Sequence, residues 1–66
     1  MKNTIKVERA KKDVTQAGLA EQLGVSRQTV NAIEKGKFVP STVLALKMAQ
    51  FFECKVEDVF ILENED

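Results

Sequence analysis

The sequence predicts one all-α domain of five helices, and it allows a small antiparallel β-ribbon formed by the chain ends. Apolar residues recur at helical spacing in several segments, most densely within residues 41–52. Thr15, Ser26 and Ser41 each precede such a segment, where a side-chain oxygen can cap the first turn of a helix. Gly24 follows the last apolar residue of one segment, as a residue that ends a helix in left-handed conformation does.

The length of 66 residues allows a single domain, residues 1–66, with one small core. Domains of this size usually gain stability from disulfides, a metal ion or a partner subunit. Cys54 is the only cysteine and histidine is absent, so neither an internal disulfide nor a zinc site is expected, and no cofactor is predicted. A homodimer is the remaining route to extra stability.

The composition also restricts where the protein acts and what it does. No segment has the run of about 18 apolar residues that a membrane span needs, and no apolar leader follows Met1. We therefore expect a cytoplasmic protein that does not contact a membrane. An enzyme is not expected, because the sequence lacks histidine, a Gly-rich phosphate loop and a set of metal ligands.

The first three helices are predicted from apolar residues that lie between capping and breaking residues. A first helix is predicted over residues 4–12, where apolar residues punctuate a charged segment. The run TQAGLAEQL predicts a second helix over residues 16–23. Val30 and Ile33 lie three apart on one face and predict a third helix over residues 27–35.

The rest of the chain predicts two more helices and an edge strand. Residues 41–52 predict a fourth helix with a wide apolar stripe, and residues 56–60 a short fifth one. The run VFIL has the β-branched and aromatic character of an edge strand, which needs a partner. The run KNTI can supply that partner within the subunit or across a dimer. We expect dimer contacts from VFIL, at Phe60, Ile61 and Leu62.

Charge is distributed unevenly although the formal net charge is zero. Residues 1–37 hold eight Lys and Arg against four Asp and Glu, a balance of +4. Residues 38–66 hold two against six, a balance of −4. This asymmetry indicates a side of the molecule that faces a polyanion.

The second and third predicted helices are joined by the turn LGVS, which fits a helix-turn-helix. Gly24 permits the positive φ of a tight turn, and the neighbouring Val25 suits a residue inserted between the two helices. Ala20 is small enough to let the helices approach closely. In such a motif the third helix enters the major groove of DNA.

A polar cluster occupies the leading end of the third predicted helix. Because the apolar residues of this helix face inward, Arg27, Gln28 and Asn31 point outward. Arg, Gln and Asn are the side chains that make paired hydrogen bonds to base edges. The cluster therefore predicts a base-reading surface.

The stretch VTQAGLAEQLGVSRQTVNAIEKGKFVPS, residues 14–41, resembles the motif of the Xre family of helix-turn-helix regulators, which includes phage lambda Cro and repressor. The following LALKMAQFFECKVEDVF resembles the family's fourth and fifth helices. The resemblance implies a lambda-repressor-like DNA-binding domain with its core motif at about residues 15–36. It also implies a minimal member, without a small-molecule ligand domain, that binds double-stranded DNA at an inverted repeat as a homodimeric repressor.

Matched position by position, the resemblance assigns roles to individual residues. The residues expected to contact bases are Arg27, Gln28, Asn31 and Ala32. The residues expected to contact the DNA backbone are Gln16, Ser26, Thr29, Lys35, Lys37 and Phe38. Arg9 and Glu34 match positions where the family often has a structural salt bridge between the first and third helices.

Gly18 and Cys54 depart from the family pattern, and one alternative function stays open. Cys54 stands where small or polar turn residues are usual, and we expect it to pack partly at the end of the fourth helix. Gly18 stands where the family usually has Glu, which removes a capping box with Thr15 and costs roughly 1 kcal/mol relative to Ala. The alternative is a protein-interaction module, such as the antitoxin of a toxin–antitoxin pair. Antitoxins of this fold also bind DNA, so the predicted site would be the same and the cellular role would differ.

Overall fold

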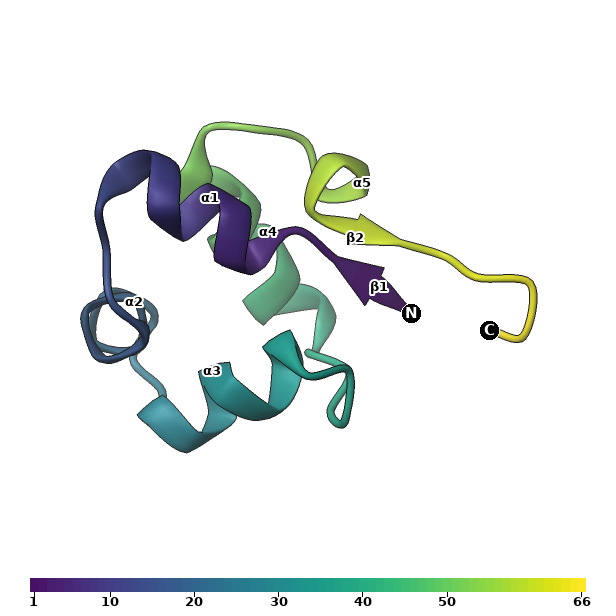
Figure 1. Ribbon diagram of the computed structural model, residues 1–66, viewed down its shortest axis with the longest axis horizontal. Coiled ribbons are helices and arrows are strands. Elements are labelled where there is room, and N and C mark those ends of the chain that lie inside the picture. Colours follow the sequence, from purple (N-terminus) through teal and green to yellow (C-terminus); the bar gives the residue numbers. More distant parts are fainter.

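The computed structural model describes residues 1–66 and contains five helices and two short strands (Figure 1). The helices are α1 (Ile5–Lys12), α2 (Gln16–Leu23), α3 (Arg27–Glu34), α4 (Thr42–Phe52) and α5 (Val56–Val59). The strands are β1 (Lys2–Asn3) and β2 (Phe60–Ile61). The predicted all-α fold with a small terminal ribbon is confirmed, and each helix boundary lies within one residue of the predicted one. None of the helices combines the length and apolarity that a bilayer crossing requires.

Hydroxyl side chains begin three helices at the residues predicted from the sequence. Thr15, Ser26 and Ser41 each accept a hydrogen bond from the backbone N–H three residues further on, at 2.9, 3.1 and 3.2 Å respectively. Each bond satisfies an N–H group that has no partner inside the helix. Such a cap contributes typically about 1 kcal/mol to stability, so α2, α3 and α4 start at fixed positions.

Two of the helices end at residues with a Cβ atom in the left-handed conformation, and the sequence marked only one of them, Asp13, as a helix end. Gly24 ends α2 with a φ of 73°, as predicted. Asp13 ends α1 and Glu53 ends α4 in the same left-handed region, with φ of 54° and 59°. This conformation is costly for most residues with a Cβ atom. Backbone hydrogen bonds close both turns, from the N–H of Val14 to the carbonyl of Arg9 and from the N–H of Cys54 to the carbonyl of Ala49, each at 3.0 Å.

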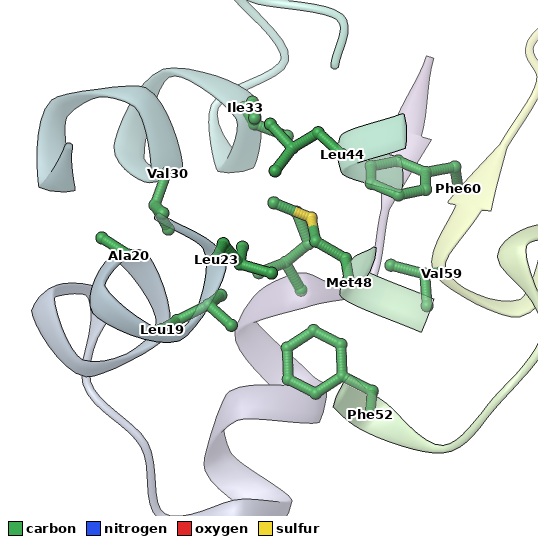
Figure 2. Packing of buried hydrophobic residues seen from close by; sticks show 11 residues of the cluster. Leu19, Ala20, Leu23, Val30, Ile33, Leu44, Met48, Phe52, Val59 and Phe60 are labelled. Atoms are coloured by element: carbon green, nitrogen blue, oxygen red, sulfur yellow. The ribbon is translucent and has the colours of Figure 1, made fainter. Parts of the chain in front are cut away.

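The core fills the space where the helices meet, and Met48 of α4 lies at its centre (Figure 2). Met48 has no exposed surface, and the figure shows side chains of α2 and α3 on one side of it and those of α5 and β2 on the other. The cluster consists of Ile5, Leu19, Ala20, Leu23, Val30, Ile33, Leu44, Met48, Phe52, Val59 and Phe60. Full burial of one such larger side chain is worth about 1.5–3 kcal/mol, so this cluster is the main source of stability.

The neighbouring phenylalanines of α4 occupy different environments. Phe52 is buried in the core, whereas Phe51 is half-buried at its edge. The two rings meet edge to face with centroids 5.3 Å apart, and Lys12 Nζ lies 5.7 Å from the centroid of Phe51. Phe51 therefore contributes edge packing between α4 and the end of α1.

Cys54 follows α4 and packs half-buried against the core. Burial raises the pKa of its thiol, and the nearby carboxylates of Glu8 and Asp58 act in the same direction. A raised pKa keeps the thiol protonated at neutral pH, so Cys54 serves as a small packing residue.

The two strands pair antiparallel within one chain, with Lys2 opposite Ile61 and Asn3 opposite Phe60. Of the two partners that the sequence left open for KNTI, the structure thus uses the one within the subunit. The predicted strand VFIL is shorter than expected, because Val59 is the last residue of α5 and Leu62 lies beyond the end of β2. Val59 and Phe60 are both buried. Consecutive residues of one strand point to opposite faces, so a strand with one covered face could not bury both side chains.

Candidate nucleic-acid interface

The turn between α2 and α3 has the geometry of a helix-turn-helix. Gly24 takes the left-handed conformation, with a φ of 73°, that residues with a side chain rarely adopt. The N–H of Val25 donates to the carbonyl of Ala20 at 3.0 Å, and the Val25 side chain packs half-buried against the core. Ala20 is only 3% exposed, so its small side chain lies where larger ones would separate the helices. The turn therefore fixes the angle between α2 and α3.

Helix α3 lies along one edge of the molecule, and no other element covers its outer side (Figure 1). Val30 and Ile33 attach its inner side to the core. Of the predicted base-reading residues, Arg27 and Gln28 are exposed at the N-terminal end of α3. The other two, Asn31 and Ala32, follow one turn later and are half-buried.

Ser26 and Thr29 form a local pair at the start of α3. Ser26 Oγ caps the helix, and it lies 2.9 Å from Thr29 Oγ1 in a hydroxyl–hydroxyl hydrogen bond. Both hydroxyls keep acceptor or donor capacity, because a hydroxyl can make more than one hydrogen bond. They stand beside Arg27 and Gln28 at the end of α3 that would enter a groove.

Glu34 is the centre of a hydrogen-bonded network between three helices. Arg9 Nε donates to Glu34 Oε2 at 2.6 Å, and the same guanidinium also donates to the carbonyl of Val14 at 3.1 Å. Gln16 Nε2 donates to the other Glu34 oxygen at 3.3 Å. The side chains of Arg9 and Glu34 are only 16% and 9% exposed, so the predicted salt bridge is present and largely buried.

The amide of Gln16, a predicted phosphate contact, is therefore also part of the network that joins α1 and α3. Its 3.3 Å bond to Glu34 is long for a hydrogen bond to a carboxylate. Gln16 is half-buried at the first position of α2, where unpaired backbone N–H groups favour an anion.

The connection from α3 to α4 presents the remaining predicted backbone contacts. Gly36 reverses the chain with a φ of 74°. Lys35, Lys37 and Phe38 around it are all exposed, with Phe38 at 51%. Neither lysine forms an ion pair within the chain, so both charges are available to a ligand.

Asn3 is a structural residue that no sequence pattern singles out. Its Nδ2 donates to the carbonyl of Ile33 at 2.9 Å and lies 3.4 Å from that of Glu34, at the end of α3. Its Oδ1 accepts from the N–H of Ile5 at 3.2 Å, at the start of α1. Asn3 thus joins β1 to the C-terminal end of α3. An asparagine before a helix indicates a cap, but the second contact spans 30 residues and has no local signal.

The three predicted dimer residues differ in exposure. Phe60 is 8% exposed and packs into the core of its own chain. Ile61 is 43% exposed and Leu62 is 77% exposed. Most of the apolar surface that this run offers to a partner therefore belongs to Ile61 and Leu62.

These features together define a class of protein. A tight glycine turn joins two capped helices, the second of which is anchored inward by two apolar residues and turns polar side chains outward. This is the arrangement of a helix-turn-helix DNA-binding domain, in which the second helix of the motif lies in the major groove.

Comparison with known proteins identifies the family. A family model described as helix-turn-helix matches residues 5–59, so the chain belongs to the Xre-type helix-turn-helix family of transcriptional regulators. An uncharacterized HTH-type transcriptional regulator of Methanocaldococcus jannaschii is 56% identical over 66 residues, which cover 100% of both chains. The uncharacterized HTH-type transcriptional regulator YgzD of Bacillus subtilis is 54% identical with the same coverage. A regulator of Archaeoglobus fulgidus with the same description is 47% identical over 100% of this chain and 93% of its own.

Proposed function

We propose that the protein binds one specific double-stranded DNA sequence as a homodimer and represses transcription by occluding a promoter. The observation that supports this proposal most directly is the outer side of α3, where Arg27 and Gln28 are exposed beside a turn of fixed geometry. The similarity to regulators over full chain length supports the same function.

Base reading is assigned to the outer side of α3. Arg27 makes paired hydrogen bonds to guanine O6 and N7, and Gln28 makes them to adenine N6 and N7. Asn31 contacts a base deeper along the helix. Ala32 offers its methyl group to a thymine methyl, an apolar contact that fits its half-buried position.

Backbone binding is assigned to residues on both sides of the reading surface. Ser26 and Thr29 contact a phosphate through their hydroxyls, and the N-terminus of α2 with Gln16 receives another. Lys35, Lys37 and the main chain at Phe38 contact phosphates beyond the far end of α3. These contacts orient the domain but do not distinguish sequences.

Dimerisation is assigned to an apolar face that extends from β2 to α4. To this face we assign the exposed Ile61 and Leu62 and, from α4 and the turn before it, the exposed Val39 (67%), Val43 (63%) and Leu46 (54%). An open hollow of about 250 Å³, with Leu46 and the edge of Phe60 in its wall, lies within it. A monomer rarely exposes so many neighbouring apolar side chains, and a second copy related by a two-fold axis would cover them.

Selection of duplexes from a random-sequence library tests the proposal. The recovered sequences are expected to share an inverted repeat whose half-site centres lie about 34 Å, or one helical turn, apart. The spacing suits a molecule with a longest dimension of 31 Å. Failure to enrich any sequence would contradict specific binding, whereas enrichment of a single half-site would contradict the dimer alone.

A further inference from the structure

Two polar hollows adjoin each other beside α3. One, of about 470 Å³, has no apolar side chain in its wall and lies between α1, the start of α2 and α3. The side chains of Lys6, Arg9, Gln16, Asn31, Glu34 and Lys35 line it. The other, of about 310 Å³, shares Glu34 and Lys35 with the first and adds Lys2 of β1.

The charge of this surface is positive once its internal ion pair is counted. Glu34 is the only acidic residue in either wall, and Arg9 neutralises it at 2.6 Å. Lys2, Lys6 and Lys35 are exposed and form no ion pair within the chain. Three unpaired cations therefore lie along a polar surface, which suits an anion better than an apolar ligand.

We propose that Lys2 and Lys6 extend the DNA interface beyond the helix-turn-helix by contacting phosphates of one DNA strand. With Lys35 they form a surface that we call the N-terminal lysine track. This inference rests on the proposed function, because it places the same DNA on α3. It assigns a binding role to β1 and α1, which lie outside the motif that reads the bases.

The position of the track relative to α3 is the first argument. Asn31 and Lys35 are one helical turn apart and both line the larger hollow, so the track begins on the side of the reading helix. A helix that lies in the major groove has a sugar-phosphate strand on each side of it. The strand on the α1 side then runs past Lys6 and Lys2.

The rigidity of the track is the second argument. Asn3, the neighbour of Lys2, is bonded to the end of α3 at 2.9 Å, and Lys6 lies in the first turn of α1. The backbone that carries each lysine is therefore fixed relative to α3. Pre-ordered cations lose less conformational entropy on binding than cations on a mobile arm.

The salt dependence of DNA binding tests this inference. We expect the double variant Lys2→Gln/Lys6→Gln to bind the duplex recovered by selection more weakly than the wild type. The slope of log K against log salt should become shallower by about 0.9 for each phosphate that the variant no longer neutralises, with an unchanged sequence preference. Lys55→Gln is the matched control, because Lys55 is an unpaired lysine in the turn before α5. Figure 1 shows α5 on the opposite side of the molecule from α3.

Two outcomes would overturn the inference. If the double variant and the control keep the wild-type slope while the wild type binds the duplex, the track does not contact DNA, although the proposed function stands. If the wild type binds no duplex, both the inference and the proposed function fail. Circular dichroism of each variant, expected to match the wild type, excludes unfolding as the cause of a changed slope.

Discussion

Arg27 and Gln28 lie at the exposed N-terminal end of α3, and substituting them tests base reading at the scale of single residues. We expect Arg27→Ala or Gln28→Ala to weaken specific binding by about 1–3 kcal/mol and to relax the preference at particular positions of the half-site. Lys37→Ala should weaken binding to all sequences by a similar factor. Repeating the selection with each variant checks this. An unchanged sequence preference in both alanine variants would show that another face of the protein reads the bases.

Other residues of the site were less accessible to sequence reasoning. Periodicity identifies the outer side of α3, but it does not reveal that Asn31 is half-buried beside Gln16 in a shared hollow. The same is true of the bond between Gln16 and Glu34. These facts depend on how α1, α2 and α3 pack, and a local pattern holds no information about such packing.

At the scale of elements, the ion pair of Arg9 and Glu34 joins α1 to α3. Substituting Arg9 tests whether this pair holds α3 in place. We expect Arg9→Met to lower the free energy of unfolding by about 3–5 kcal/mol, because it leaves a largely buried carboxylate without its partner. Thermal or urea unfolding measures the effect. The double variant Arg9→Met/Glu34→Met removes both charges and should be clearly more stable than the single variant. Equal stability of the single variant and the wild type would show that the pair is dispensable.

The elements were predicted well wherever their signals are local. Three hydroxyl caps and the spacing of apolar residues defined α2, α3 and α4 to within one residue. The predicted strand was too long at both ends, because Val59 belongs to α5 although valine favours strands, and Leu62 follows the last residue of β2. The left-handed turn at Glu53 has no sequence signal, because residues other than Gly, Asn and Asp seldom adopt this conformation.

At the scale of the whole molecule, the apolar face predicts the oligomeric state. We expect the wild type to sediment as a dimer at micromolar concentration and Leu46→Glu or Leu62→Glu to sediment as a monomer, because a buried unpaired charge opposes association. Val7→Glu is the control, since Val7 is 55% exposed on α1 and lines no part of the hollow in this face. Truncation is a poorer test, because Val59 and Phe60 belong to the core.

The oligomeric state of the wild type also shows whether the exposed face is a contact between two copies or is free for a different protein. A wild type that sediments as a monomer, like the Leu46 and Leu62 variants, would leave the face open to a different protein, as the antitoxin alternative expects. A dimer that all three substitutions leave intact would place the interface elsewhere on the surface.

The pairing of the chain ends has a consequence for how the domain folds. The N–H of Thr4 donates to the carbonyl of Val59 at 2.9 Å, so this bond closes a loop that contains nearly the entire chain. Closing a loop of this length costs on the order of 3–4 kcal/mol of chain entropy beyond a constant term. Because β2 ends at Ile61, the ribbon can close over the core only after the chain has been synthesised as far as that residue. A chain that ended before Val59 would lack the core side chains of Val59 and Phe60 and the hydrogen bond at the start of α1.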